Sequence, residues 1–304
     1  MLQLQKATRK KSKLRLNISG PSGSGKTYSA LLMAKGLVGD WTKIGVIDTE
    51  TGSASLYEHL GDFQAVDLQA PYTPERYIEA IDLCVRGGME CIIIDSSTHE
   101  WSGQGGCIEI NDKLAQSKYK GNTWSAWSQT TPRHDAFVQK VLQCPVHVIT
   151  CTRSKIETVM TDDKKVKKLG MKDIQREGWE YELTVSLNLD RDTHTATASK
   201  DRTELFDKLD PFVITEATGK MIADWCDKGI TVDPPKVTTG VKVTIHDEIP
   251  NAAVAEDFYP AWQTAVNACE TVEKLQELWE GNKATCEADP KIKTMFANRK
   301  KELK

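Results

Sequence analysis

The sequence predicts an α/β fold with a central, mostly parallel sheet, followed by a small helical module at the C-terminus. Over residues 1–228, short apolar runs alternate with stretches of helical period, the pattern of parallel strands joined by crossover helices. Residues 229–254 are rich in proline and glycine and have the composition of a linker. Helical period then returns over residues 255–304. We therefore predict a core at 1–228, a linker at 229–254 and a helical module at 255–304.

The first predicted elements of the core are a strand, a helix, a second strand and a second helix. The strand covers residues 14–19, which are mostly apolar. The helix covers 26–37 and ends before Gly39, because glycine readily takes the left-handed conformation that closes a helix. The second strand covers 43–48. A proline then opens a helix over 74–85, since proline suits the first turn of a helix.

A strand that is apolar throughout comes next, over residues 91–95, with three consecutive isoleucines. The polar residues 153–180 contain no clear periodic pattern and are predicted to be a long irregular segment. The remaining predicted elements of the core are a helix, a buried strand, a hairpin and a last helix, over 123–142, 145–151, 181–189 with 193–199, and 218–226.

Charge and composition set broad limits on function. The 304 residues carry 40 basic and 43 acidic side chains, a net charge of −3, which neither requires nor excludes binding to nucleic acid. No run of about 18 apolar residues is present, and residues 1–15 lack the apolar stretch of a secretory signal, so we expect a cytoplasmic protein without a membrane span. None of the eight cysteines forms a CxxC pair, which favours reduced structural thiols over a zinc site or a disulfide framework.

A glycine-rich loop joins the first strand to the first helix. Its backbone N–H groups can surround phosphates, Lys26 can reach the β- and γ-phosphates, and the Thr27 hydroxyl can bind magnesium. This motif predicts a protein that binds ATP with Mg²⁺, and an ATPase. The predicted nucleotide-binding residues form one continuous run: Gly20, Pro21, Ser22, Gly23, Ser24, Gly25, Lys26, Thr27 and Tyr28.

Asp95 ends the strand that is apolar throughout and is the predicted second magnesium ligand. A carboxylate at the carboxyl edge of a parallel sheet faces the same crevice as the phosphate loop. In the AAA+ class a glutamate follows this aspartate, whereas Ser96 follows Asp95 here, so that class is disfavoured. The strand at 43–48 also argues against kinase and G-protein arrangements.

Three segments, taken together, resemble RecA-like P-loop ATPases. They are the phosphate loop, Val46-Ile47-Asp48-Thr49-Glu50 and Ile92-Ile93-Ile94-Asp95-Ser96, in that order. The resemblance implies a RecA-like P-loop NTPase core in which Glu50 polarises the attacking water. His99 and Glu100 are weaker candidates for that role. Size, segment order and the phrase Val-Ile-Thr-Cys-Thr-Arg-Ser-Lys at 148–155 narrow the likeness to compact phage-encoded ATPases of single-strand annealing and recombination.

Two features qualify this resemblance. RecA proteins carry a glutamine that senses the γ-phosphate after the strand that corresponds to 145–151, whereas here Thr152 or Arg153 would have to act as the sensor. Lys200 and Arg202 resemble the Lys-x-Arg signature of RadA, KaiC and DnaB-type ring ATPases. That likeness implies a homo-oligomer, ring or filament, in which both cations act catalytically on the γ-phosphate of the neighbouring subunit. The alternative is an exposed charged turn.

Several basic segments are candidate nucleic-acid surfaces. In RecA-like proteins the loop equivalent to 153–180 contacts single-stranded DNA, but a merely solvated loop is the alternative because acidic residues alternate with the basic ones. Segment 101–127 contains Trp101, Tyr119, Trp124 and Trp127, which could stack on bases or pack in the core. The basic ends at 6–15 and 291–304 could bind a nucleic-acid backbone or simply be solvated. The predicted DNA-binding residues are Lys164, Lys165, Lys167, Lys168 and Lys172.

The predicted function is an ATP-binding and ATP-hydrolysing RecA-like protein that acts on single-stranded DNA in recombination, annealing or repair. If the protein is phage-encoded, it acts in the cytoplasm of the bacterial host, and a single-strand-binding or other recombination protein is a possible partner. The alternative is an ATP-dependent regulatory switch that binds a protein through the helices of 255–304. A small-molecule kinase is disfavoured because the sequence has no arginine-rich lid.

Overall fold

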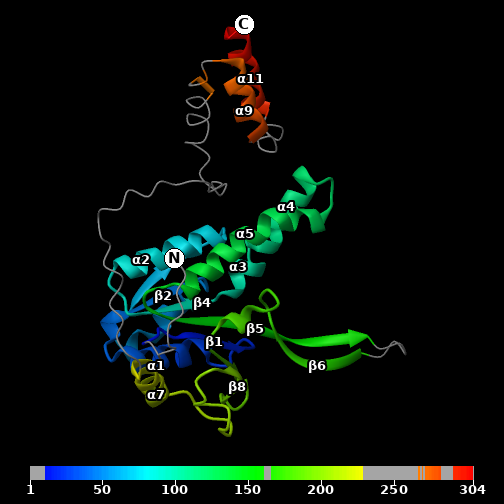
Figure 1. The fold of residues 1–304 in the computed structure, drawn as a ribbon. Helices are drawn as coiled ribbons and strands as arrows, with labels where there is room; N and C mark the ends of the chain where they lie inside the picture. The colour runs from blue at the N-terminus through cyan, green and yellow to red at the C-terminus, as the bar shows by residue number, and fades with distance from the viewer. Residues whose placement is uncertain are drawn as a thin grey trace. The chain divides into compact units, whose positions relative to one another are not determined.

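The computed structural model describes residues 11–160, 166–228, 266–267, 269, 271–281 and 290–303. Contacts divide the chain into two compact units, Met1–Pro234 and Pro235–Lys304 (Figure 1). The predicted linker at 229–254 lies outside the described residues.

The first unit is built around an eight-stranded sheet in the order β3-β2-β4-β5-β1-β7-β8, with β6 paired to β5. All neighbouring strands are parallel except the pairs β5–β6 and β7–β8. The predicted α/β fold with a mostly parallel sheet is therefore confirmed. The strands are β1 Arg15–Gly20, β2 Ile44–Asp48, β3 Gln64–Asp67, β4 Cys91–Asp95, β5 His147–Met160, β6 Val166–Asp173, β7 Val185–Leu189 and β8 Ala196–Asp201.

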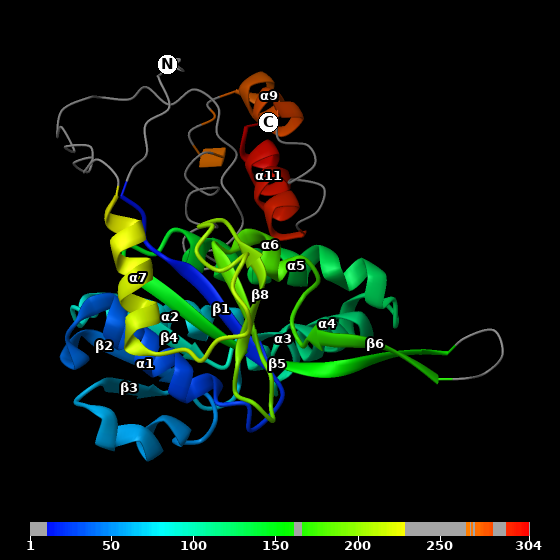
Figure 2. The same ribbon diagram turned by 90° about the horizontal axis from the view of Figure 1, so that it is seen from below.

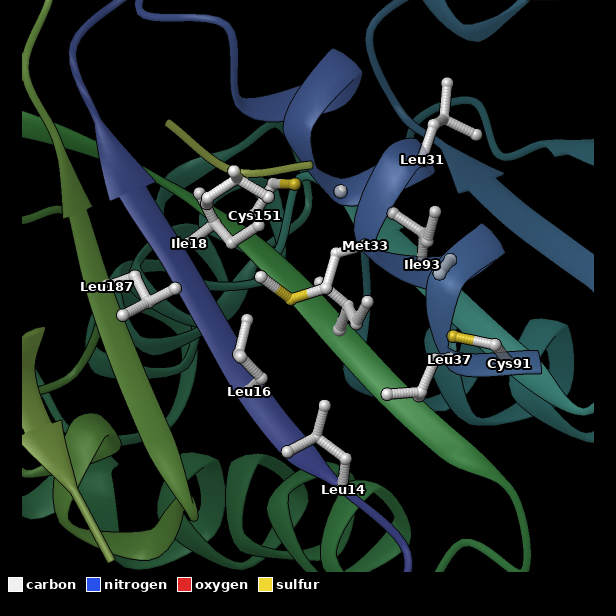
Figure 3. Close-up of a cluster of buried hydrophobic side chains, with 14 of the residues drawn as sticks. Leu14, Leu16, Ile18, Leu31, Met33, Leu37, Cys91, Ile93, Cys151 and Leu187 are labelled. Atoms are coloured by element: carbon white, nitrogen blue, oxygen red, sulfur yellow. The ribbon is translucent and has the colours of Figure 1, made fainter. Parts of the chain in front are cut away.

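Helices cover both faces of this sheet (Figures 1 and 2). The first face packs on α1 and α7 through β1, β5 and β7, and Figure 3 shows this core with Leu16 and Ile18 of β1 beside Met33 of α1. The opposite face packs on α2 and α5. The helices are α1 Lys26–Val38, α2 Pro74–Arg86, α3 Thr98–Ser102, α4 Cys107–Lys118, α5 Thr123–Leu142, α6 Trp179–Glu182 and α7 Glu216–Asp227, with 3-10 turns η1 Trp41–Lys43 and η2 Ser53–Leu60.

The contact between α1 and α7 is backbone against backbone at two glycines. A Cβ atom on Gly36 would lie 1.9 Å from the Glu216 carbonyl oxygen, and one on Gly219 would lie 2.1 Å from the Met33 carbonyl oxygen. Only glycine allows this approach, because any side chain would overlap the facing helix. Contact with α7 therefore fixes the position of α1 and of the loop that precedes it.

Two segments differ from the sequence prediction. The first is residues 153–180. In the part of it that the structure describes, β5 continues to Met160 and pairs with β6 from Ser154↔Asp173 to Met160↔Val166, so the prediction of an irregular segment is wrong there. We call this paired segment the β5–β6 ribbon, and both views show it extending beyond the rest of the sheet (Figures 1 and 2). β-Branched residues in the outer part of β5 favour a strand, but the mixed charges around them obscured the pattern.

In the second segment, residues 101–127, a helix was predicted only from residue 123, whereas the structure is largely helical from residue 101 onward. It contains the end of α3, all of α4 and the start of α5. Short β3 was also missed, because its residues are mostly exposed and give no apolar run.

The second unit contains α9 Val272–Gly281 and α11 Pro290–Glu302. Leu275 and Ile292 are buried between them, and the rings of Trp279 and Phe296 lie 5.1 Å apart. No described helix of either unit is long and apolar enough to cross a membrane.

Candidate active site

The glycine-rich loop leaves the carboxyl end of β1 and leads directly into α1. Gly23 and Gly25 have φ values of 80° and 88°, so the loop uses the left-handed conformation that glycine permits. Lys26 Nζ donates hydrogen bonds to the carbonyl oxygens of Gly20 and Pro21, at 3.0 and 2.9 Å. The start of α1 thus faces the loop with its unpaired N–H groups, an arrangement that attracts anions.

Asp95 lies next to Thr27 at the same edge of the sheet. Thr27 Oγ1 donates to Asp95 Oδ2 at 2.5 Å, whereas the buried Oδ1 has no hydrogen-bond partner among the described residues. Burial raises the pKa of the Asp95 carboxyl to about 6, while the hydrogen bond from Thr27 and the charge of Lys26 act in the opposite direction. A hydroxyl oxygen beside an unpartnered carboxylate oxygen is a donor set that suits Mg²⁺.

Glu50 is held in place by the turn that follows β2. The buried carboxylate of Asp48 accepts hydrogen bonds from the backbone N–H groups of Glu50 and Ala54, at 2.7 and 2.8 Å. The Glu50 side chain forms an ion pair with Arg153, with Nε 2.9 Å and Nη2 2.7 Å from Oε1. Since β4 alone separates β2 from β5, this pair connects the turn after β2 with the middle of β5, on either side of the strand that ends at Asp95.

These side chains meet around a cavity of about 160 Å³. Its walls come from the phosphate loop, the turn after β2, the end of β4 and the middle of β5, with three further residues from η2. The lining residues are Ser22, Gly23, Gly25, Lys26, Thr27, Glu50, Ser53, Leu56, Tyr57, Asp95 and Arg153. A larger cavity of about 340 Å³ lies between α9 and α11, but it lacks any comparable convergence of acid, lysine and phosphate loop.

Some predicted residues do not line the 160 Å³ cavity. The buried Thr152 hydroxyl donates instead to Asn17 Oδ1 at 2.7 Å. Tyr28 is 41% exposed, and its ring lies 6.0 Å from that of Tyr57. His99 contacts Thr49 Oγ1 through Nδ1 at 2.8 Å. Glu100 is fully buried and away from the cavity.

Lys200 and Arg202 lie at the opposite edge of the sheet from their own phosphate loop. Strand β8 is antiparallel to β7, and Asp201 pairs with Val185 at the end of β7 that is far from the loop. Lys200 Nζ donates to the Glu180 carbonyl at 2.8 Å, and an Arg202 Nη donates to the Tyr181 carbonyl at 2.9 Å. Within one chain, these cations do not reach the cavity.

Two contributions were missed from the sequence. His194, with φ of 55°, contacts the Ser24 carbonyl oxygen through Nδ1 at 3.1 Å, so the β7–β8 turn touches the phosphate loop. A hairpin beside β1 could have suggested this contact, because the β7–β8 turn lies at the same edge of the sheet as the loop. The η2 residues Leu56 and Tyr57 carry no motif and could not have been found this way.

The structure describes only some of the predicted DNA-binding lysines and places these on strand β6. Lys164 and Lys165 lie outside the described residues, while Lys167 and Lys168 belong to β6, and exposed Lys172 pairs in register with Lys155. At the N-terminal basic segment, residues 6–10 lie outside the described part.

The positions of Arg15, Trp101 and Trp127 do not fit the prediction that these side chains bind nucleic acid. Arg15 is not available to bind nucleic acid, because it is 7% exposed and donates to the carbonyls of Leu14 and Val146. Trp101 and Trp127 stack on each other at 5.4 Å, whereas Trp124 is 86% exposed.

Comparison with known proteins identifies the family. The model of the AAA domain family matches residues 12–234, which include the sheet and every residue of the cavity. No curated protein matches the chain. The match corrects the prediction that Ser96 disfavours the AAA class, since the chain belongs to the AAA domain family with a serine after Asp95. The chain therefore belongs to the AAA domain family of P-loop ATPases, which bind and hydrolyse ATP with a divalent metal ion.

Proposed function

We propose that ATP binds in the 160 Å³ cavity and is hydrolysed there, and that the protein acts on single-stranded DNA as an oligomer. The observation that carries the proposal is the convergence of Lys26, Thr27, Asp95, Glu50 and Arg153 on one cavity. Thr27 and Asp95 are the residues that would hold Mg²⁺, which supplies charge neutralisation on the phosphates. The exposed face of η2, with Tyr57 at the cavity, offers an apolar surface for the adenine ring of ATP.

Glu50 is the proposed base that orients the attacking water. The hydrogen bond from its backbone N–H to Asp48 holds the Glu50 carboxylate at the cavity. In this structure the carboxylate is bound to Arg153 rather than free to bind water. An incoming γ-phosphate offers Arg153 a more highly charged partner than Glu50 does. Exchange of that partner would release Glu50 toward water, which supports Arg153 rather than Thr152 as the sensor.

The proposed oligomer follows from the position of Lys200 and Arg202. Because they lie far from their own cavity, any contact with a phosphate must be made in a neighbouring copy of the chain. Both cations bind main-chain carbonyls of α6 in the single chain, and these bonds would be exchanged for phosphate contacts when copies associate. The proposed assembly is a ring or a filament.

The proposed DNA contact is the β5–β6 ribbon. Strand β5 is continuous from the sheet into the ribbon. Arg153, which lines the cavity, lies in the middle of this strand. A change at the γ-phosphate would thus pass along β5 to its paired strand β6, which carries Lys167, Lys168 and Lys172. Basic side chains on a two-stranded ribbon would bind a phosphate backbone with little sequence preference and strong salt dependence. From the sequence resemblance we further propose that the protein is a phage-encoded RecA-like protein that acts in the cytoplasm of a bacterial host, with a single-strand-binding or recombination protein as partner.

The test measures ATP turnover with and without single-stranded DNA. The proposal predicts that DNA binds and raises turnover, and that Lys172→Glu weakens DNA binding while the matched change Lys220→Glu, at an exposed lysine of α7, does not. Lys26→Ala should lose nucleotide binding or turnover in all conditions. If DNA neither binds nor stimulates while a protein partner does, the DNA role is wrong, and the alternative of a regulatory switch working through the cavity between α9 and α11 gains support.

A further inference from the structure

A second polar cluster is buried among α3, α4 and α5, away from the nucleotide cavity. It consists of Glu100, Cys107 and His134, which are 0%, 0% and 2% exposed. Cys107 Sγ lies 3.1 Å from Glu100 Oε1, and His134 Nδ1 lies 3.0 and 3.1 Å from the two carboxylate oxygens. One ligand atom from each residue lies within 4.8 Å of the others. Nothing in ATP binding or hydrolysis uses these side chains.

We propose that Glu100, Cys107 and His134 bind one zinc-type divalent cation. Thiolate sulfur, imidazole nitrogen and carboxylate oxygen are the three kinds of ligand that Zn²⁺ takes in proteins. Hard ions such as Mg²⁺ prefer oxygen-only sites, so the thiol distinguishes this site from the pair Thr27 and Asp95.

Charge balance supports the proposal. A fully buried carboxylate is costly unless a positive charge or several strong donors compensate it. The hydrogen bonds that reach the Glu100 carboxylate come from Cys107 and His134, whereas Arg133, next to His134 in the sequence, is committed to Glu75 through two hydrogen bonds of 2.6 and 2.8 Å. A dication with one thiolate, one carboxylate and a neutral imidazole has zero net charge, which suits a site shielded from water. Without the ion, burial and the carboxylate raise the pKa of the Cys107 thiol, which then serves only as a weak donor to Glu100.

The geometry is close to what an ion requires. Metal–ligand bonds of about 2.0–2.3 Å in a tetrahedral arrangement separate the ligand atoms by about 3.3–3.8 Å. The separations of Cys107 Sγ and His134 Nδ1 from Glu100 Oε1, 3.1 and 3.0 Å, would have to widen by only a few tenths of an ångström, and the ligand atoms of Cys107 and His134 lie within 4.8 Å of each other. The surroundings are those of a closed site: Trp101 packs edge-on against the His134 ring at 5.3 Å and stacks on Trp127. A water molecule or the second oxygen of Glu100 could complete the coordination.

The proposed ion would join three helices and stabilise one wall of the catalytic cleft. Helix α3 begins at Thr98, whose hydroxyl accepts a hydrogen bond from the backbone N–H of Arg153 at 2.9 Å. Glu100 lies in the same short helix. A cation that anchors Glu100 would therefore hold the support of Arg153 in place, which assigns the site a structural role.

The test uses the full chain with any affinity tag removed and no nucleotide present. Metal content is measured after equilibration with Zn²⁺ and exhaustive dialysis, and Co²⁺ binding is followed by the cobalt–thiolate absorption band, which a site made only of oxygen ligands cannot produce. The expected result is about one zinc per chain with a thiolate band. Cys107→Ser should remove the band and lower zinc affinity by at least about tenfold, whereas Cys144→Ser, a buried cysteine outside the cluster, should change neither.

A wild-type chain that retains less than about a tenth of a zinc per chain and shows no thiolate band overturns the proposal, whatever the variants do. Unchanged zinc content in Cys107→Ser also overturns the proposal. If Cys107→Ser fails to fold, Glu100→Gln takes its place, because it preserves the side-chain shape and should still weaken zinc retention.

Discussion

His147, at the start of β5, makes the stability of the core depend on pH. Its Nδ1 accepts a hydrogen bond from the Leu14 backbone N–H at 3.0 Å, so the neutral ring carries its proton on Nε2. Lys13 Nζ lies 3.5 Å from that nitrogen. Protonation of Nδ1 would break the bond to Leu14 and add a positive charge beside Lys13 and Arg15. Burial, followed by these two cations, lowers the pKa of His147 from 6.5 to about 3.

The size of the effect follows from that shift. Because the folded-state pKa lies below the unfolded value, the unfolded chain binds the proton more readily, and stability is lost as pH falls from about 6.5 towards 3. Between pH 7 and pH 5 the expected loss is about 2 kcal/mol of unfolding free energy, and below pH 3 it reaches about 5 kcal/mol.

The assay is urea unfolding of the full chain at pH 7 and pH 5, followed by circular dichroism. In the wild type, His147 should lower the free energy of unfolding by about 2 kcal/mol between pH 7 and pH 5. His147→Gln should lack this contribution, since glutamine does not titrate. His59→Gln, a change at an exposed histidine, should keep the wild-type dependence. Equal pH dependence in wild type and His147→Gln would refute the reasoning.

Three further substitutions test the packing and the catalytic proposals. Gly219→Val should destabilise the core by at least about 3 kcal/mol because its side chain must overlap the backbone of α1; a melting temperature within about 2 °C of the wild type would contradict this. Arg153→Ala should bind ATP but turn it over at least about tenfold more slowly if Arg153 senses the γ-phosphate, whereas wild-type turnover would remove that role. Arg202→Ala should also bind ATP, and its turnover should fall by at least about a hundredfold; unchanged turnover would remove the proposed action on a neighbouring subunit.

Local signals explain which parts of the fold could be predicted from the sequence. The three isoleucines before Asp95 and the strand–loop–helix context of the phosphate loop lie in short continuous segments, so pattern alone located them. Lys26, Thr27, Glu50 and Asp95 each follow or end a strand of a parallel sheet, and parallel strands bring their carboxyl ends to one edge. That is why residues predicted separately meet in a single cavity.

Features that depend on distant contacts could not be predicted in this way. Arg15 was predicted to belong to a basic segment that is solvated or binds nucleic acid, but it donates hydrogen bonds to the carbonyl groups of Leu142, at the end of α5, and of Val146, just before β5. The β5–β6 ribbon derives its order from pairing between two halves of a mixed-charge segment. Glu100, Cys107 and His134 come from three helices, so no cysteine spacing pointed to them.

The most direct test of the central claim is the turnover of Glu50→Gln measured beside its affinity for ATP. If Glu50 polarises the attacking water in the cavity, this variant should bind ATP with Mg²⁺ within about twofold of the wild type and lose about 10²- to 10⁴-fold in kcat. A kcat within about threefold of the wild type, with the variant folded and binding ATP, would contradict the account.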